Sequence, residues 1–183
     1  SQVLSLRKDL SIKLLRGNVD TRIQKLRNHE YDAVILSLAG LARLNLDHLV
    51  TEVLEHNLFL PAACQGAVGV QALKNSEVKK ILAPINDLKT QTECMAERRV
   101  LKNINANCNS PVSIYANINK NNITLEFEIF DHQGNKIFKK LKEDLKENYL
   151  RLCDELGEEI INTLGQTKIN ELDNFKSDFD YTP

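Results

Sequence analysis

Three arginines near the start of the sequence have the type and spacing needed to bind an anionic ligand. Arg16 comes between an apolar run and a predicted helix, Arg22 lies in the first turns of that helix, and Arg43 lies on the next predicted helix. A strand-to-helix turn presents unpaired N–H groups at the positive end of the helix dipole, and guanidinium groups add forked donors suited to carboxylate or phosphate. The pattern is typical of an oxyanion cradle, but arginines on a solvated helix face would have the same spacing.

A second candidate for chemistry is Cys108, in the polar loop 105–111. Beside small polar residues and a proline, such a thiol is either exposed and reactive or half-buried and structural. The other cysteines are Cys64, Cys94 and Cys153, and the last lies on the apolar side of a predicted helix. Because the four match no CxxC or zinc-ligand spacing, we expect no disulfide framework, no metal site and a reducing compartment.

The elements that position the arginines alternate between strand and helix. Residues 12–15 and 31–36 are apolar runs that predict two strands. The first is followed by a helix that begins after Asn18, an expected N-cap, and the second by a helix over residues 37–46. A β-α-β-α order over residues 11–57 predicts a parallel sheet that binds ligands at the carboxyl ends of its strands.

The second half of the sequence has a different organisation. The apolar run 58–73 is broken by two glycines and is compatible with a strand that crosses between domains. The pattern beyond it predicts an α+β unit with three antiparallel strands, and an acidic tail that frays from residue 170. The expected helices are 76–85, 88–104 and 144–165, and the expected strands are 112–118, 123–130 and 136–141.

Composition narrows the function classes. The 183 residues are 42% hydrophobic and 27% charged with a formal net charge of −1, as in an ordinary soluble protein. No apolar stretch approaches the roughly 18 residues that span a bilayer. Residues 1–43 carry eight Lys/Arg against four Asp/Glu, whereas residues 143–183 carry four against eleven. The absence of Trp and of a dense basic run argues against nucleic-acid binding.

Six segments, in their order and spacing, resemble the porphobilinogen deaminase (hydroxymethylbilane synthase) family from about residue 2 to residue 165. They are LRGNVDTR (15–22), EYDAVIL (30–36), AGLARL (39–44), LPAACQGAVGV (60–70), AER (96–98) and Cys108 with Pro111. The family joins four porphobilinogen molecules head to tail, releases ammonia at each addition, and produces the linear tetrapyrrole hydroxymethylbilane for porphyrin and haem biosynthesis. The resemblance therefore implies a transferase.

The resemblance also implies a cofactor and the residues around it. The family builds its product on a dipyrromethane held by a thioether to one cysteine, which corresponds to Cys108. Every pyrrole ring carries carboxylates, which explains the need for several arginines. The implied cofactor contacts are Cys108, Arg16, Arg22, Ser37 and Gly40, and the implied substrate contacts are Arg43 and Gln65.

The family fold places the chain as a C-terminal part that lacks most of the first domain. Residues 1–57 would be the later part of an α/β lobe like those of periplasmic binding proteins, and 58–75 the segment that returns to the first domain. Residues 76–169 would be the small α+β domain with the cofactor cysteine, and 170–183 an acidic tail. The catalytic aspartate belongs to the missing domain, so we expect no catalytic residue here and no turnover by this chain alone.

The implied partners are porphobilinogen and the growing pyrrole chain, in the cytoplasm, without membrane or nucleic acid. The full-length parent would be a monomer, whereas an exposed crossing segment predicts that this piece dimerises or swaps. Two departures from the family stand out. Cys64 replaces a usual glycine, and Ala106-Asn107 replace Gly-Gly before Cys108. The alternative function is a non-catalytic α/β module that binds a carboxylate ligand.

Overall fold

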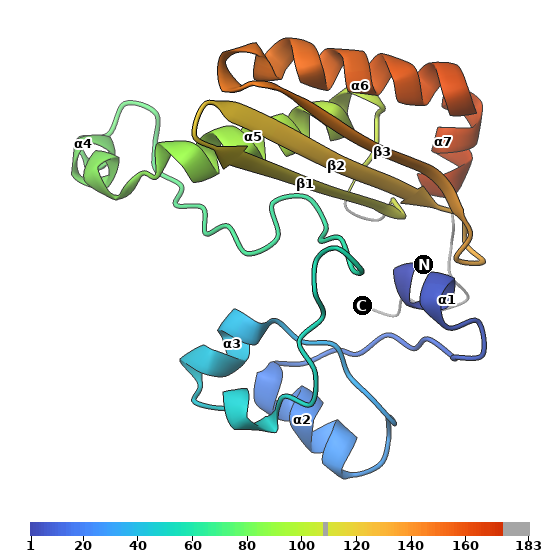
Figure 1. Cartoon of the computed structure of the whole chain (residues 1–183). Coiled ribbons are helices and arrows are strands. Elements are labelled where there is room, and N and C mark those ends of the chain that lie inside the picture. Colours follow the sequence, from blue (N-terminus) through green and yellow to red (C-terminus); the bar gives the residue numbers. More distant parts are fainter. Residues whose placement is uncertain (108–109, 174–183) are drawn as a thin grey trace. The chain divides into compact units, whose positions relative to one another are not determined.

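The computed structural model describes residues 1–107 and 110–173, which form two compact units (Figure 1). The N-terminal unit is Asp9–Leu58, and the C-terminal unit consists of Ser1–Lys8 with residues 59–173. In these described residues, no helix has the length and the apolar character to cross a membrane.

The C-terminal unit is built on an antiparallel sheet with the strand order β1-β2-β3. Helices α5 (Leu88–Asn103) and α6 (Tyr149–Leu164) cover one face of this sheet (Figure 1). The strands are β1 (Val112–Asn119), β2 (Asn122–Phe130) and β3 (Lys136–Leu145). The predicted three-stranded antiparallel sheet with flanking helices is therefore confirmed.

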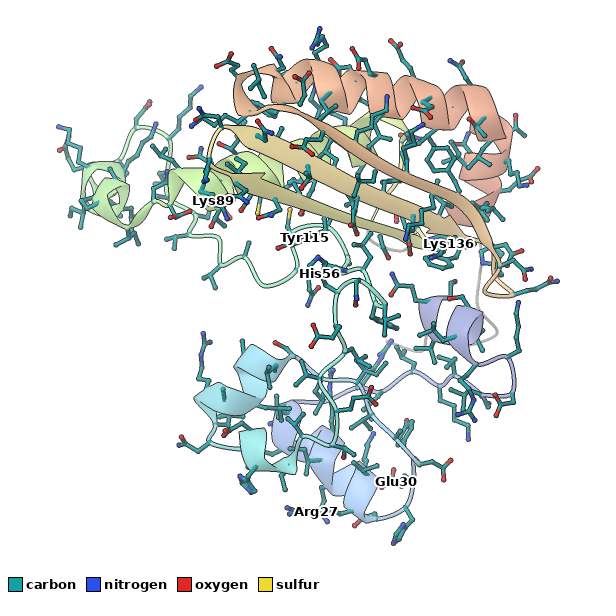
Figure 2. The ribbon with its side chains drawn as sticks, in the orientation of Figure 1. Arg27, Glu30, His56, Lys89, Tyr115 and Lys136 are labelled. Carbon is teal, nitrogen blue, oxygen red and sulfur yellow. The ribbon has the colours of Figure 1, made fainter. Side chains whose placement is uncertain are left out.

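The first residues of the chain pack against the β2–β3 hairpin of the same unit. Helix α1 (Gln2–Leu6) touches the hairpin so closely that a Cβ on Gly134 would lie 2.6 Å from the Cβ of Leu4. Lys8 then donates from Nζ to Asn135 Oδ1 at 2.6 Å. Lys136, labelled at the start of β3 in Figure 2, pairs with the buried Glu128 at 2.7 Å. The contacts of Leu4 and Lys8 with the hairpin explain why Ser1–Lys8 belong to the C-terminal unit.

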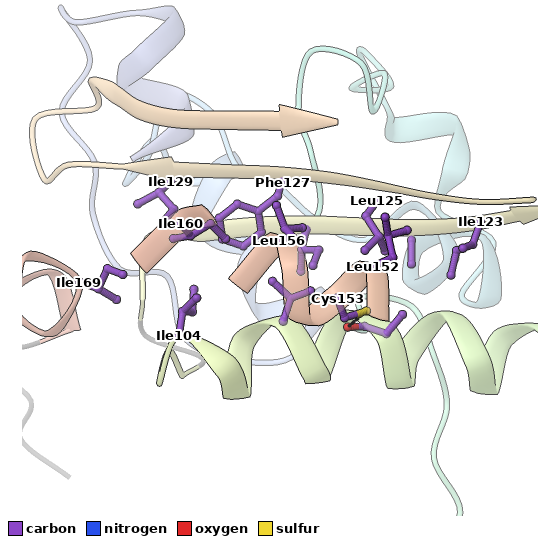
Figure 3. Packing of buried hydrophobic residues seen from close by; sticks show 14 of the residues in the cluster. Ile104, Ile123, Leu125, Phe127, Ile129, Leu152, Cys153, Leu156, Ile160 and Ile169 are labelled. Atoms are coloured by element: carbon purple, nitrogen blue, oxygen red, sulfur yellow. Dashed lines mark hydrogen bonds between the residues drawn. The ribbon is translucent and has the colours of Figure 1, made fainter. Parts of the chain in front are cut away.

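The core lies between the sheet and the two helices (Figure 3). Alternate residues of β2 point into it because successive side chains of a strand face opposite sides. The rings of Phe127 and Phe138 meet edge to face with centroids 6.0 Å apart. The fully buried members from β2 and α6 are Ile123, Leu125, Phe127, Ile129, Cys153, Leu156 and Ile160. Their burial confirms the apolar face predicted for the last long helix.

Three expected boundaries in this unit are wrong. The helix expected over 76–85 is α4 (Val78–Leu82) followed by a 3₁₀ turn (Ala83–Ile85), since Pro84 cannot continue an α-helix. The helix expected from residue 144 begins at Tyr149, because β3 extends to Leu145 and a 3₁₀ turn (Lys146–Asn148) follows. Residues 170–173 belong to α7 (Gln166–Asp173), which packs Ile169 and Leu172 into the core, so the chain does not fray from residue 170.

The N-terminal unit has the expected helices but not the expected strands. Helices α2 (Val19–Arg27) and α3 (Leu38–Arg43) are present, and a 3₁₀ turn (Asp47–Leu49) follows. Residues 12–15 and 31–36 form no strand, and neither does the run 58–73. An apolar run becomes a parallel strand only beside a neighbouring strand that satisfies its backbone. Within this unit the carbonyl of Leu14 instead accepts from the Tyr31 hydroxyl at 3.1 Å.

The segment 66–73 leaves large apolar side chains in solvent. Val68 and Leu73 are 82% and 83% exposed, and Val70 is 60% exposed. We predict that the isolated chain self-associates through this segment, because contiguous exposed apolar surface favours association. Light scattering after size exclusion should give a concentration-dependent mass above 20.8 kDa. Replacing Val68 and Leu73 by Ser should shift the mass to the monomer, and a chain that is monomeric at all concentrations would contradict the prediction.

Helices α5 and α6 approach each other at a glycine. A Cβ on Gly157 of α6 would lie 2.7 Å from the Cβ of Asn103 on α5. The Asn103 side chain is held there, because its Nδ2 donates to Asp154 Oδ1 at 2.8 Å. Arg99 makes a bidentate ion pair with the same carboxylate. The glycine therefore sets the spacing of the two helices.

We predict that Gly157→Ala destabilises the chain by about 1–2 kcal/mol in urea unfolding, because overpacking of about 1–3 kcal/mol outweighs the better helix propensity of alanine. Gly69→Ala is the matched control, since a Cβ at Gly69 meets nothing within 4 Å. That control should lose no stability. Equal stabilities of the two variants would contradict a close approach at Gly157.

Candidate functional site

The first part of the candidate site is the turn that precedes α2. Asn18 caps this helix by accepting from the Thr21 N–H at 2.9 Å, as predicted. Arg22 folds back so that its Nε donates to the carbonyl of Gly17 at 2.8 Å. Gly17 has φ +121°, where other residues are strained, and a Cβ there would lie 2.9 Å from the Thr21 side chain. The turn thus fixes one edge of the Arg22 guanidinium against the residue that follows Arg16 in the sequence.

The start of α3 lies next to the start of α2. Ser37 caps α3 through its Oγ, which accepts from the Gly40 N–H at 3.3 Å. A Cβ on Gly40 would be 4.0 Å from a methyl group of Val19, the first residue of α2. The N-terminal unit therefore brings together the predicted residues Arg16, Arg22, Ser37 and Gly40. Arg43 lies at the other end of the short helix α3.

Arg16 and Arg22 place positive charge around the start of α2, whose first turn also contains Asp20, and Arg43 adds a charge in the last turn of α3. Arg16 and Arg43 are exposed and Arg22 is half-buried. In the described parts of the chain, no ion pair joins Arg22 or Arg43 to a carboxylate. Two helix starts add further N–H donors to the guanidinium groups. The donor set suits a ligand that carries several carboxylates.

Gln65, the other predicted substrate contact, lies in the C-terminal unit on a tight turn. Its N–H donates to Ala62 O at 3.1 Å, and the N–H of Ala67 donates to Cys64 O at 3.2 Å. Cys64 has φ +58° and Gly66 has φ +87°, so the residues on both sides of Gln65 have positive φ angles. The turn borders a pocket of about 230 Å³ whose lining includes Cys64, Gln65, Glu93, Cys94, Glu97 and Tyr115.

Glu97 is one of the residues that line this pocket. Only 6% of Glu97 is exposed. Its Oε2 accepts from the Cys64 N–H at 2.6 Å, and its Oε1 accepts from the Ala116 N–H at 2.9 Å. Burial raises the pKa of Glu97, while the two backbone N–H groups act in the opposite direction. One side chain of α5 therefore joins the Gln65 turn to the strand β1.

Glu97 is one of three groups that cover the outer edge of β1. The N–H of Ile114 donates to Pro61 O at 3.1 Å, and the N–H of Ile118 donates to Glu93 Oε1 at 2.7 Å. The N–H groups of Ile114, Ala116 and Ile118 alternate along this edge, and each donates to an acceptor outside the sheet. An edge strand covered in this way is protected from pairing with another strand. Tyr115, between two of these residues, is labelled in Figure 2.

Cys108 lies outside the residues that the structure describes, but both ends of its loop are described. The Asn107 N–H donates to Ser110 Oγ at 2.8 Å, and the Ser110 N–H donates to Asn107 O at 3.1 Å. Pro111 O accepts from the Phe130 N–H at 3.0 Å. The loop is therefore closed between the end of α5 and the start of β1.

Two family models match the chain. Residues 1–80 match "Porphobilinogen deaminase, dipyromethane cofactor binding domain", and residues 91–164 match "Porphobilinogen deaminase, C-terminal domain". The chain belongs to the porphobilinogen deaminase family. This confirms the resemblance read from the sequence motifs.

Relatives within the porphobilinogen deaminase family show how much of it the chain represents. A porphobilinogen deaminase of Clostridium kluyveri is 38% identical over 162 residues, which are 87% of this chain and 54% of the relative. One of Clostridium botulinum is 37% identical over 88% of this chain and 55% of its own length. One of Roseiflexus sp. is 39% identical over 74% of this chain and 45% of its own length. The chain spans about half the length of these relatives.

The structure adds residues that the sequence interpretation missed. The porphobilinogen deaminase motif AER includes Glu97, but nothing in the sequence showed that its carboxylate would bind Cys64 and Ala116. A glutamate on the inward side of a helix was the available signal, since a buried carboxylate needs hydrogen-bond donors. The roles of Arg16, Arg22, Ser37, Gly40, Arg43, Gln65 and Cys108 in binding stay predictions.

We predict that Glu97→Gln destabilises the chain by about 1–3 kcal/mol, because an amide has one acceptor oxygen and leaves a second buried N–H without its acceptor. Glu93→Gln is the matched control one turn earlier. Glu93 accepts from a single N–H, which an amide oxygen can replace, and its pair with Lys89 is a partly exposed i,i+4 pair. Urea unfolding should show less than about 1 kcal/mol lost in this control. Similar losses in both variants would contradict the bridging role of Glu97.

Proposed function

We propose that this chain contributes the later part of the second domain and the third domain of a hydroxymethylbilane synthase. The activity joins four porphobilinogen molecules head to tail, releases ammonia at each addition and forms hydroxymethylbilane in porphyrin and haem biosynthesis. The observation that carries the proposal is the pair Arg16 and Arg22 at the start of α2, next to the capped start of α3. It lies inside the residues that match the cofactor-binding family model, and its donors suit a ligand with many carboxylates.

The proposed cofactor is a dipyrromethane attached through a thioether to Cys108. It supplies the primer to which pyrrole rings are added. Arg16, Arg22 and the N–H groups near Ser37 and Gly40 would hold its acetate and propionate groups. Each charge-assisted hydrogen bond of this kind contributes about 1.5–3 kcal/mol. Because Arg22 is already oriented by the Gly17 carbonyl, little side-chain freedom is lost when it binds.

The substrate-binding roles follow the same chemistry. Arg43 has no carboxylate partner among the described residues, so it is suited to the carboxylates of an incoming or added ring. Gln65 is exposed on a turn whose backbone is held by Glu97 through Cys64. Its amide can both donate and accept hydrogen bonds to a pyrrole substituent. None of these residues is assigned to acid–base catalysis.

We also propose that Asp9–Leu58 is the later part of an α/β lobe like those of periplasmic binding proteins. Two capped helices each follow an apolar run, and their starts lie in contact. In such a lobe residues 12–15 and 31–36 would be strands once neighbouring strands pair with them. Ligands bind at the carboxyl ends of parallel strands, where Arg16 and Ser37 lie in the sequence.

A chimera tests the function. In it, this chain replaces the aligned 162 residues of the Clostridium kluyveri relative. We predict that the chimera releases ammonia from porphobilinogen, and that its denatured mass shows a two-pyrrole increment that Cys108→Ala abolishes. The chain alone should release no ammonia, because the aspartate implied for acid–base catalysis is not among its residues. A folded chimera without turnover, or without the Cys108-dependent increment, would contradict the proposal.

Two arginines of α2 provide a matched comparison in the same chimera. Arg22→Ala should lower kcat/KM roughly tenfold or more, which corresponds to the loss of one charge-assisted bond of about 1.5–3 kcal/mol. Arg27→Ala should leave it unchanged, because Arg27 lies in the last turn of α2, away from the start of the helix (Figure 2). Equal losses in the two variants would show a general effect of positive charge.

A further inference from the structure

Two thiols meet in the pocket beside the Gln65 turn. Cys64 and Cys94 both line it and both are half-buried. The Cys64 thiol donates to the carbonyl of Cys94 at 3.6 Å. The other described cysteine, Cys153, is fully buried in the core and directs its thiol to the carbonyl of Ala96. Among the described cysteines, Cys64 and Cys94 are therefore partly accessible to an oxidant, whereas the buried Cys153 serves as an internal control.

We propose that Cys64 and Cys94 are a redox-active dithiol that hydrogen peroxide converts into a reversible intramolecular disulfide. The proposal goes beyond the proposed function, since neither thiol is needed to bind cofactor or substrate. It assigns a modification site to the segment 59–67 and the middle of α5.

The backbone around Cys64 is held in position for this reaction. The Cys64 N–H donates a hydrogen bond to Oε2 of Glu97, and Glu97 follows Cys94 by three residues on α5. Residues three apart lie on the same face of a helix. The helix therefore presents both the partner sulfur and the carboxylate that anchors Cys64.

The two sulfurs have different parts in the reaction. Burial and the neighbouring Cys94 raise the pKa of Cys64 to about 12, which disfavours Cys64 as the thiolate that attacks peroxide and leaves that step to Cys94. The Cys94 thiolate attacks one peroxide oxygen, the O–O bond breaks, and Cys94 sulfenic acid and hydroxide form. Cys64 sulfur then attacks Cys94 sulfur, the S–O bond breaks, and the leaving hydroxide takes the Cys64 proton as water. Two thiols are oxidised, and one peroxide is reduced to two waters.

The disulfide would have a defined structural effect. It would join the Gln65 turn covalently to α5, in addition to the hydrogen bond from Cys64 to Glu97. Local opening of residues 61–67 would then be restricted, because the cross-link removes the separated states of the turn. The reduced and oxidised chains should differ in amide hydrogen exchange at this turn.

Peptide mapping tests the proposal on the full chain. The chain is treated with stoichiometric hydrogen peroxide, alkylated and digested with trypsin, which separates Cys64 in peptide 44–74 from Cys94 in peptide 90–98. We expect these two peptides joined with the loss of two hydrogens, released by a dithiol reductant, with Cys153 alkylated only after unfolding. In the oxidised chain, exchange at residues 61–67 should slow at least roughly tenfold relative to the reduced chain.

Single cysteine variants show which thiol forms the sulfenic acid and which one resolves it. In Cys64→Ser, dimedone should trap a sulfenic acid on Cys94, whereas Cys94→Ser should give little adduct on Cys64. Cys108→Ser must leave the cross-link intact, which separates this pair from the cysteine of the proposed cofactor. Circular dichroism confirms that each variant is folded. Cross-links that join two chains or that contain Cys108, or a wild-type chain with Cys64 and Cys94 oxidised singly, would overturn the proposal.

Discussion

The carboxylate of Glu97 accepts hydrogen bonds from two backbone segments that belong to no common helix or strand. Its two oxygens satisfy the N–H of Cys64, in the segment before α4, and that of Ala116 on β1. At 6% exposure, water cannot take over these bonds. A buried N–H without an acceptor costs about 1–3 kcal/mol. The position of the Gln65 turn, the covered edge of β1 and the shape of the pocket all depend on this side chain.

The sequence predicted the C-terminal unit well because its elements pair with near neighbours. The alternation of Ile123, Leu125, Phe127 and Ile129 needs only the adjacent strand β1 and the helices α5 and α6 to become a buried face. The two expected strands of the N-terminal unit were different. Residues 12–15 and 31–36 are as apolar as a buried parallel strand, but an apolar pattern cannot supply the neighbouring strand that completes a ladder. Periodicity predicts burial better than it predicts pairing.

The contacts of the candidate site also differ in how far apart their residues lie in the sequence. The contacts around Arg22, Asn18, Ser37 and Gly40 are local, spanning three to five residues; the capping rule predicted the cap at Asn18, and the structure added the Ser37 cap and the Arg22 contact. The contacts of Glu97 span 19 and 33 residues, and those of Cys64 with Cys94 span 30. No spacing rule connects positions that far apart. The family motifs include Cys64 and Glu97 without connecting them, and the structure supplied the physical reason for Glu97.

The same carboxylate explains how a cysteine can occupy a position that the family resemblance assigns to glycine. Cys64 has φ +58°, which costs a residue with a Cβ about 1–2 kcal/mol. A hydrogen bond from its N–H to a charged, buried acceptor contributes about 1.5–3 kcal/mol and is made only in this conformation. The bond therefore offsets the backbone strain. It also fixes the direction of the Cβ, so the thiol is carried towards Cys94 and the strained position becomes part of a dithiol.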